Sequence, residues 1–555
     1  MRIREVGDSA LLLELAAGEA QASGVIDPDV NARAIAIART VRGRAVPGVR
    51  DVTSTFSSVA VFFDPLATDV EGLVAALHNV EDDSLPPATG KLVEVPVMYG
   101  GAAGPDLDDV AAYAGCSPQS VIDRHAGTSY RVFMLGFLPG FAYMATVDQS
   151  IAVPRRSTPR VRVPVGSVGL AGRQTGIYPQ ESPGGWQIIG RAGLQLFDAN
   201  RAAPTLFEPG DHVRFVPTSA IDVAAAVSPS SAVPRPDSAT KLATRCATVL
   251  RPGLLTTVQD TGRWGYQGLG VPVSGPMDAV AHRLANAVIR NPPDAATLEA
   301  TLLGPELRLE QDTWIALGGA DLSATLDGAA VPLQEPLRCR MGSVLRFGER
   351  RSGVRVYVAF EGGIAVPRVL GSRSTHVLSG LGGVEGRAVR AGVRLPLGAP
   401  GGEPRRLRSD VGGDLEVCPA QGVRLRILPG PQIEFFDPSA FEKLQRTRFT
   451  ISPQSDRMGY RLVGGSPPAC AVTGQMISDA TFAGGLQIPP DGDPILLMAD
   501  RQATGGYPQL AIVITADLSR AAQLAPGDWV EFEACSRSDA LSALITQEGK
   551  LLAVR

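Results

Sequence analysis

Short runs of alternating apolar and polar residues, separated by Gly and Pro, dominate the chain and predict strands more often than helices. From Tyr130 to Pro217 these strands and turns follow one another at short intervals, a pattern typical of a closed barrel or sandwich. The second half, from about Ala243, continues in the same way, with buried strands expected at 356–363 and 510–517. The chain is therefore expected to be mainly β, within an α+β protein.

Helical spacing of apolar residues is confined to a few segments. Near the N-terminus, Val30–Val41 and Val70–Val80 have this spacing and alternate with strand-like runs, which predicts a small α/β domain. A third helix is expected between Ser117-Pro118, an N-cap followed by Pro at the first helical position, and Gly127. A fourth begins near Asp278, with an apolar face made of Val280, Leu284, Ala287 and Val288.

Breaks in these patterns divide the chain into six parts. The Ser- and Pro-rich stretch PSSAVPRPDSAT is the clearest linker and separates two halves. The predicted parts are a small α/β domain at 1–88, a β-barrel at 89–218, a linker at 219–242, a β-rich subdomain at 243–405, a second barrel at 406–536 and a C-terminal tail at 537–555.

Composition narrows the classes of function. The 52 basic and 56 acidic residues leave a net charge of −4, so there is no electrostatic reason to expect nucleic acid or a membrane surface as partner. The six cysteines form no CxxC pair and the five histidines lack metal-ligand spacing, which favours free thiols and no metal site. No apolar run approaches the ~18–20 residues that cross a bilayer. We expect a cytoplasmic protein.

One polar segment occurs twice. GLAGRQTGIYPQ begins at Gly169, and LLMADRQATGGYPQ, which is one residue longer within the motif, ends at Gln509. Each segment is followed by a Pro-Gly-Asp turn and an alternating strand, in LFEPGDHVRFVP and LAPGDWVEFEA. Two landmarks that recur in the same order predict two related β-barrels, one in each half.

Each copy combines a cation, a carboxamide, a hydroxyl and a phenol on a Gly/Pro frame. Such a set suits a planar polar group such as a carboxylate, amide, ureido group or phosphate, and it equally suits a β-bulge corner that satisfies backbone carbonyls. The residues concerned are Arg173, Gln174, Thr175 and Tyr178 in the first copy, and Arg501, Gln502, Thr504, Gly505 and Tyr507 in the second, with Asp500 flanking it.

Further candidates surround these copies. GFLPGFAYM contributes Phe141 and Tyr143 to an apolar wall, with core packing as the alternative, and SPGGW offers Trp186 beside a Gly-Gly backbone. Arg160 belongs to an Arg-rich strand that is either a solvated edge or an anion-binding strand. In the second half, the candidates for charge handling and binding are Gln259, Asp260, Arg263, Asp278 and Arg373.

Two common catalytic motifs are absent from the sequence. No GxxxxGK[ST] phosphate loop and no Gly-x-Ser-x-Gly elbow with a convincing Asp/His set occurs. His376 is more often a structural histidine than a base in such a context.

Long motifs carry a family resemblance. Through GFLPGFAYM, PRRSTPRVRVPVGSVGLAGRQTGIYP and SPGGWQIIGR, the first half resembles the KipI type, also called allophanate hydrolase subunit 1. Through VQDTGRWGYQGLGVPVSGPMD, AFEGGIAVPRVLGSRST, SDRMGYRL and PDGDPILLMADRQATGGYP, the second half resembles the KipA type, or subunit 2. One departure is Arg290 before Asn291, where the family usually has a Gly.

The resemblance implies cyclophilin-like β-barrels in both halves, which contact each other, and three functions. The first is the fused B and C components of an ATP-dependent 5-oxoprolinase, which uses ATP with Mg and acts with a separate A component of the LamB/YcsF type. The second is a carboxyltransferase that uses carboxybiotin and a urea- or amide-like substrate, with biotin carboxylase and carrier on other chains. The third is a non-catalytic regulator of a histidine kinase. Formation of homo-oligomers is left open.

For either enzyme, the active cleft is expected where the two halves meet. Asp260, Arg263, Asp278 and Arg501 are the predicted catalytic residues, with Arg501, Gln502, Thr504 and Tyr507 first for substrate recognition. The other candidates, from the two Arg-Gln segments and from the segments around them, are predicted to bind substrate.

Overall fold

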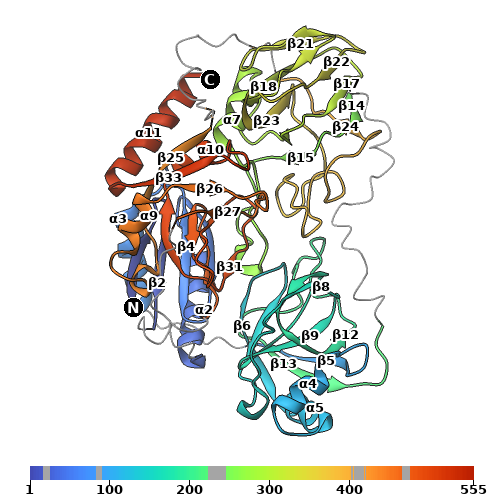
Figure 1. Cartoon of the computed structure of the whole chain (residues 1–555), viewed down its shortest axis with the longest axis vertical. Coiled ribbons are helices and arrows are strands. Elements are labelled where there is room, and N and C mark those ends of the chain that lie inside the picture. Colours follow the sequence, from blue (N-terminus) through green and yellow to red (C-terminus); the bar gives the residue numbers. More distant parts are fainter. Residues whose placement is uncertain are drawn as a thin grey trace.

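The computed structural model describes residues 1–16, 26–82, 90–222, 245–401, 404, 418, 421–465 and 476–554. Residues 223–242 of the predicted linker and Cys470 lie outside these residues. The described residues form a small N-terminal domain, two barrels and a pair of sheets between the barrels in sequence (Figure 1). None of their helices is long and apolar enough to cross a membrane.

The N-terminal domain is an antiparallel sheet in the order β1-β2-β4-β3, covered by two helices. Its elements are β1 (Arg2–Val6), β2 (Ala10–Glu14), α2 (Pro28–Gly43), β3 (Val49–Ser54), β4 (Ser58–Phe63) and α3 (Val70–Asp82). One face of the sheet packs on the helices through Leu11, Leu13, Val59 and Val61. The other packs on the second barrel, where Phe62 meets Phe482. Every residue of β4 is therefore buried.

The first barrel closes in the order β10-β7-β6-β13-β5-β12-β9, and its first and last strands, β5 and β13, run parallel. Its strands are β5 (Leu92–Tyr99), β6 (Ser129–Leu135), β7 (Ala142–Ala145), β9 (Ser167–Ala171), β10 (Gln174–Ile177), β12 (Gln187–Ala192) and β13 (His212–Pro217). Outside the barrel lie α4 (Leu107–Tyr113), α5 (Pro118–Ala126), the turn η1 (Gln149–Ile151) and a ribbon of β8 (Arg160–Val163) with β11 (Ser182–Gly184).

The second barrel repeats this topology strand for strand, in the order β25-β32-β29-β30-β27-β26-β33, with β25 parallel to β33. Its strands are β25 (Gly422–Pro429), β26 (Phe449–Ile451), β27 (Gly459–Val463), β29 (Gly485–Gln487), β30 (Ile495–Leu497), β32 (Gln509–Val513) and β33 (Trp529–Ala534). A ribbon of β28 (Asp479–Ala480) with β31 (Thr504–Gly505) matches β8–β11. The other elements are η4 (Ile433–Phe435), α9 (Ala440–Arg446), α10 (Thr515–Ala521) and α11 (Arg537–Val554).

Two stacked sheets and helix α7 form the part between the barrels. One sheet has the order β20-β19-β22-β17-β14-β24, from β14 (Cys246–Arg251), β17 (Glu306–Leu309), β19 (Thr325–Leu326), β20 (Ala329–Ala330), β22 (Val344–Arg346) and β24 (Arg394–Pro396). The other has the order β15-β16-β23-β18-β21, from β15 (Leu255–Gln259), β16 (Thr297–Thr301), β18 (Thr313–Asp321), β21 (Leu337–Cys339) and β23 (Ser352–Phe360). Helix α7 (Ala279–Val288) packs on β18 and β23, and the short turn η3 (Gln267–Leu269) precedes it.

The predicted fold class is confirmed: the chain is mostly β, with a barrel in each half after a small N-terminal domain. The four predicted helices are present. Ser117 caps one of them as expected, and Asp278, near which another was expected to begin, caps that helix. The strand expected at 510–517 is shorter, because β32 ends at Val513 and α10 begins at Thr515.

The two barrels repeat one topology, but only one of the two repeated sequence segments occupies equivalent positions in them. The Pro-Gly-Asp turns are equivalent: Gly210 N donates to Val132 O before β13, and Gly527 N donates to Ile451 O before β33. The Arg-Gln segments are not equivalent. The first enters barrel strand β10, whose counterpart is β30, whereas the second follows β30 and forms β31 of the ribbon. The prediction that the two Arg-Gln segments are equivalent landmarks of the two barrels is therefore wrong.

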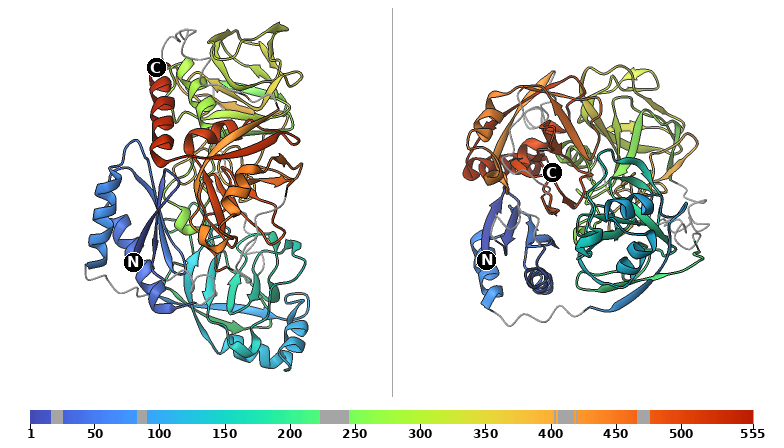
Figure 2. Two further views of the ribbon diagram at one scale, coloured as in Figure 1. Left: turned by 60° about the vertical axis from the view of Figure 1, so that its left-hand side comes forward. Right: turned by 60° about the horizontal axis from the view of Figure 1, so that its bottom comes forward.

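The two halves contact each other through several hydrogen bonds. Asp8 accepts from Thr515 N at 2.9 Å, and Ser58 Oγ donates to Asp479 at 2.6 Å. The N-terminal domain lies against the second barrel (Figure 2). These contacts place the N-terminal domain beside residues from the second half. It also contacts the first barrel, where Asn31 Nδ2 donates to Phe133 O at 3.1 Å and the ring of Phe56 packs on that of Phe133.

Candidate functional site

A cleft of about 690 Å³ lies where the N-terminal domain, the segment leading into α7 and the second barrel meet. The N-terminal domain contributes Arg50 and residues 64–67, and helices α10 and α11 also contribute lining residues. Arg50 pairs with Asp64 at 2.5 Å and lies over the ring of Trp264. The first barrel does not line this cleft among the described residues. A cleft thus exists where the two halves meet, and its being the active one stays a prediction.

Arg501 is the predicted site residue that lines the cleft. Its side chain is buried, with a residue exposure of 5%. Nη2 donates to Gln267 Oε1 at 3.2 Å, and Nε has no acceptor in the described part of the chain. Burial lowers the pKa of Arg501 to about 10, against the opposing charge of Asp51. Since a guanidinium carries five N–H donors, this one is short of acceptors and suits an acceptor on a ligand.

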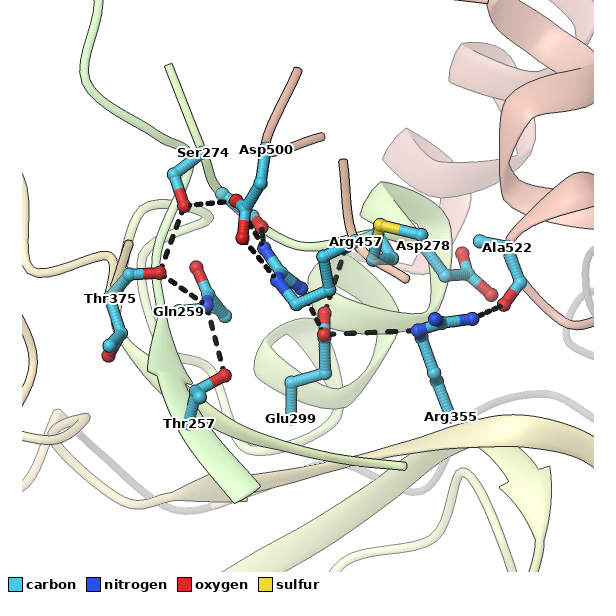
Figure 3. Close-up of polar contacts among 12 residues, drawn as sticks. Thr257, Gln259, Ser274, Asp278, Glu299, Arg355, Thr375, Arg457, Asp500 and Ala522 are labelled. Atoms are coloured by element: carbon cyan, nitrogen blue, oxygen red, sulfur yellow. Dashed lines mark hydrogen bonds and ion pairs between the residues drawn. The ribbon is translucent and has the colours of Figure 1, made fainter. Parts of the chain in front are cut away.

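Ser274 lines the same cleft in a strained conformation, with φ of +59°. Its Oγ lies 2.6 Å from Asp500 Oδ1 and 3.0 Å from the carbonyl oxygen of Thr375 (Figure 3). Both neighbours are acceptors, so they compete for the single hydroxyl proton. Asp500, which accepts from Ser274, directly precedes Arg501 in the chain.

A buried ion-pair network supports this wall from behind (Figure 3). Arg457 donates from Nε and Nη2 to the two oxygens of Asp500 at 2.9 and 3.0 Å, and from Nη2 to Gly275 O at 2.6 Å. Its Nη1 donates to Glu299. Burial alone would raise the pKa of Asp500, but Arg457 outweighs it and holds this pKa below its ordinary value. The pKa of Arg457 is correspondingly raised, because Asp500 and Glu299 outweigh the cost of burial.

Glu299 extends the network to the neighbouring elements. It accepts from Tyr357 Oη at 2.6 Å and from Met277 N at 2.9 Å. Arg355, 4.0 Å from Glu299, donates to Tyr460 Oη at 2.6 Å and to Ala522 O. Strand β16, strand β23 and the second barrel are thereby joined behind the cleft.

The predicted catalytic carboxylates lie near this wall in structural positions. Asp260 accepts from Ser372 Oγ, Ser374 Oγ and Arg373 N at 2.5–2.7 Å, which fixes the 372–374 turn. Asp278 caps α7 by accepting from Ala281 N at 2.9 Å, and burial raises its pKa. Asp278 lines a separate cavity of about 560 Å³ and is not part of the cleft wall. These contacts favour structural roles for both residues.

The other predicted residues of the second half are also held by backbone groups. Arg263 is buried, donates to Val369 O and Ser374 O, and has its pKa lowered by burial to about 10. Gln259 donates to Thr375 O at 3.1 Å, and Arg373 donates to Val366 O at 2.7 Å.

The predicted aromatic residues of the first half pack together at the contact between the barrels. Phe141, Tyr143, Tyr178 and Trp186 are buried in one cluster with Ile477 of the second half. Thr504 Oγ1 accepts from Phe137 N at 3.2 Å, and a side chain at Gly136 would overlap Thr504. This brings Thr504 beside Tyr143, away from the cleft, so the core-packing alternative is favoured.

The remaining predicted residues are dispersed. Arg160 makes a two-point ion pair with buried Asp106 at 2.6 and 2.8 Å. Thr175 Oγ1 lies 2.9 Å from His125 inside the first barrel. Arg173 and Tyr507 are exposed, and Gln174, Gln502 and Gly505 are half-buried.

Sequence reasoning missed Ser274, Glu299, Arg355 and Arg457. The available signal was a charged residue inside an otherwise apolar strand, as in TLEAT and VRVYVAF, which requires a buried partner. Arg457 and Ser274 occur in motifs that carried the resemblance, but no spacing rule connects them. In the described residues no cluster of three metal-ligating side chains occurs.

Comparison with protein families matches each half of the chain to a carboxyltransferase-domain model. The model of the carboxyltransferase domain, subdomain C and D, matches residues 1–207, and that of subdomain A and B matches residues 269–534. The C component of 5-oxoprolinase from Escherichia coli is 38% identical over 300 residues, 94% of its length and 54% of this chain. The B component of 5-oxoprolinase from Bacillus subtilis is 39% identical over 235 residues, 94% of its length and 40% of this chain.

The chain belongs to the carboxyltransferase-domain family, with its KipI-type and KipA-type parts fused in one chain.

Further similar proteins are consistent with this assignment. The crystal structure of the protein TTHA0988 is 33% identical, with a TM-score of 0.81, and covers 96% of this chain and 100% of its own. Urea amidolyase of Saccharomyces cerevisiae is 32% identical over 54% of this chain but only 17% of its own length. The urea carboxylase structure of Kluyveromyces lactis matches 56% of this chain and 29% of its own, with a TM-score of 0.53.

Proposed function

We propose that this chain is the fused B and C component of an ATP-dependent 5-oxoprolinase, which opens 5-oxoproline to glutamate with a separate A component of the LamB/YcsF type. The observation that carries the proposal is how much of the two 5-oxoprolinase components this chain matches. In chain order, the chain spans 94% of a 5-oxoprolinase B component and 94% of a C component. Its relatives that act on urea are several times longer than the part that it matches.

The cleft has polar groups suited to an amide. Hydrolysis of a lactam requires stabilisation of negative charge on the carbonyl oxygen, which a buried cation with free donors can provide. Arg501 would hold this oxygen, and the paired cations Arg50 and Arg283 would contribute less because Asp64 and Glu548 already occupy them.

The fit to a nucleotide is partial. ATP, when bound, supplies the phosphoryl group that activates the lactam oxygen. Arg501 suits one phosphoryl oxygen, but among the described cleft residues it is the one cation without a carboxylate partner. We therefore propose no position for the triphosphate on this chain.

A carboxyltransferase that acts on a urea- or amide-like nitrogen is the second candidate. The family models describe a carboxyltransferase domain, and the urea carboxylase of Kluyveromyces lactis has a related structure. In that case carboxybiotin would come from other chains, and the same cleft would hold the ureido group.

The test is reconstitution. The full chain with Mg-ATP and a LamB/YcsF-type protein should form glutamate from 5-oxoproline, whereas either component alone should not. Absence of glutamate together with urea-dependent consumption of carboxybiotin would reject the first function in favour of the second.

A further inference from the structure

Ser274, in the wall of the cleft, has a backbone conformation that is unfavourable for a residue with a side chain. A non-glycine residue at φ of +59° is disfavoured, and glycine would adopt this conformation freely. Gly275, next in the chain, has a positive φ of 91°. The chain therefore places a hydroxyl at a position where the backbone favours glycine.

The surroundings of this hydroxyl are unusual. Its oxygen contacts the carboxylate of Asp500 and the carbonyl oxygen of Thr375, which only accept hydrogen bonds. One hydroxyl proton serves both, and no donor to Ser274 Oγ occurs among the hydrogen bonds of the described residues. The lone pairs of Ser274 thus have no protein donor.

The Asp500 carboxylate fixes the direction of the hydroxyl. Asp500 is held on both oxygens by Arg457 and stays ionised, because its pKa is below the ordinary value of an aspartate. An ionised carboxylate draws the Ser274 proton away from the cleft. The lone pairs of the oxygen are then free for a donor on the cleft side.

We propose that Ser274 is a specificity-determining residue that accepts a hydrogen bond from the N–H group of the substrate amide. Arg501 lines the same cleft with an Nε donor that has no acceptor in the described part of the chain, and it takes the carbonyl oxygen of that amide. An acceptor and a donor set in one cleft match an unsubstituted lactam or ureido group, whose N–H and C=O lie on adjacent atoms. An N-alkylated amide has no such proton and leaves Ser274 unpaired. The inference rests on the proposed function in taking this cleft as the substrate site.

Binding to the full chain, without ATP or a partner protein, tests the inference separately from turnover. The probes are 2-pyrrolidinone and N-methyl-2-pyrrolidinone, titrated by ligand-observed NMR. The wild-type chain should bind the N–H lactam about 10-fold or more tightly than its N-methyl analogue, since a site built for a donor rejects a ligand without it. Equal binding of the two probes, or binding of neither, would overturn the inference.

Two variants isolate the hydroxyl. Ser274→Gly relieves the backbone strain and removes the acceptor, so its melting temperature should be unchanged or higher while the preference for the N–H probe falls to within about 2-fold. Ser374→Ala is the matched control, because Ser374 is also buried against an aspartate, at 2.7 Å from Asp260, and does not line the cleft. It should keep the preference. A Ser274→Gly variant that keeps it as well would reject the role of Ser274.

These outcomes separate the two proposals. Loss of the preference in Ser274→Gly together with no glutamate formation by the wild-type complex would reject 5-oxoprolinase activity and retain amide recognition. Glutamate formation by the wild-type complex, with an unchanged N–H preference in Ser274→Gly, would retain 5-oxoprolinase activity and reject the role of Ser274 in amide recognition.

Discussion

Arg457 and Asp500 form a fully buried two-point ion pair, with nitrogen–oxygen distances of 2.9 and 3.0 Å. Arg457 comes from the loop before β27 and Asp500 from the segment after β30, and the pair holds Ser274 and the Gly275 carbonyl at the cleft. Because Arg457 also contacts Glu299, one guanidinium joins the second barrel to the preceding sheets. The cleft wall depends on this single cation.

Replacement of Arg457 should therefore destabilise the protein strongly. Arg457→Ala leaves Asp500 buried without its cation and Glu299 with Arg355 alone, at 4.0 Å. Removal of one partner of a buried pair costs about 3–5 kcal/mol. Urea-induced unfolding followed by circular dichroism would measure this loss. Arg448→Ala removes an exposed pair with Glu531 and should cost at most about 1 kcal/mol. Equal effects of the two changes would contradict a central role for Arg457.

The sequence predicted the architecture better than the site. Strand alternation, Gly/Pro turns and the Pro-Gly-Asp landmarks are local signals, and they led to two barrels because both barrels close next to those turns. The Arg-Gln segments were matched wrongly because strand β10 and ribbon strand β31 both contain Thr-Gly shortly after an Arg-Gln pair. Similar local chemistry in two strands of one topology cannot be distinguished without the pairing partners.

The site depends on contacts between distant segments. Arg457 meets Glu299 across 158 positions and Ser274 meets Asp500 across 226, and no periodicity connects such pairs. Arg501 was found because it belongs to the repeated Arg-Gln segment, whose cation, carboxamide, hydroxyl and phenol suit a planar polar group. Asp260 and Asp278 were predicted to handle charge, but their carboxylates accept from nearby backbone groups, a role that any turn or helix cap can require.

Removal of the Arg501 side chain should strongly lower turnover with little effect on folding. The guanidinium makes one hydrogen bond of 3.2 Å, and its burial disfavours the charge, so Arg501→Ala should change the free energy of unfolding by about 1 kcal/mol or less. Loss of one donor to a developing oxyanion should lower turnover by about 100-fold or more. Glutamate formation and urea unfolding would be measured on the same preparation.

Arg173→Ala is the matched control for this change. Arg173 holds the corresponding place in the first Arg-Gln segment, but it is exposed on the first barrel and donates to Val147 O. Turnover and stability should both stay close to wild type. Unfolding of Arg501→Ala, or equal loss of turnover in both variants, would favour a structural role for Arg501.

Stability should decrease below about pH 6.5 because of a buried histidine. His282 Nδ1 lies 2.9 Å from Thr297 Oγ1, and burial lowers the pKa of His282 to about 4. An unfolded histidine has a pKa near 6.5, so the unfolded chain takes up the proton first as the pH falls from about 6.5 to 4. Above this window the contribution is complete, and within it stability is lost by up to about 1.4 kcal/mol per pH unit.

His282→Gln isolates this contribution, because glutamine does not titrate. Urea midpoints measured from pH 7.5 to 4.5 should fall less steeply for the variant than for the wild type. His125, whose pKa burial lowers to about 3, remains in both proteins and cancels in the comparison. Identical pH profiles would show that His282 is not held neutral.

Arg290 stands where the sequence resemblance leads us to expect glycine, and the structure gives a reason to expect a cost in stability. It directly follows the C-cap Ile289 of α7 with φ of +57°, a left-handed conformation that glycine usually occupies after a helix. Its side chain is exposed, so little packing offsets the strain. Arg290→Gly should therefore stabilise the protein by about 0.5–1 kcal/mol, measured by urea unfolding.

Ala287→Gly provides the control within the same helix. It introduces glycine at a right-handed position in the last turn of α7 and should destabilise the protein by about 0.5–1 kcal/mol. Opposite signs for two glycine substitutions three residues apart follow from backbone conformation alone, because both remove a side chain from one short segment. A destabilised Arg290→Gly variant would mean that the Arg290 side chain contributes contacts that outweigh its backbone strain.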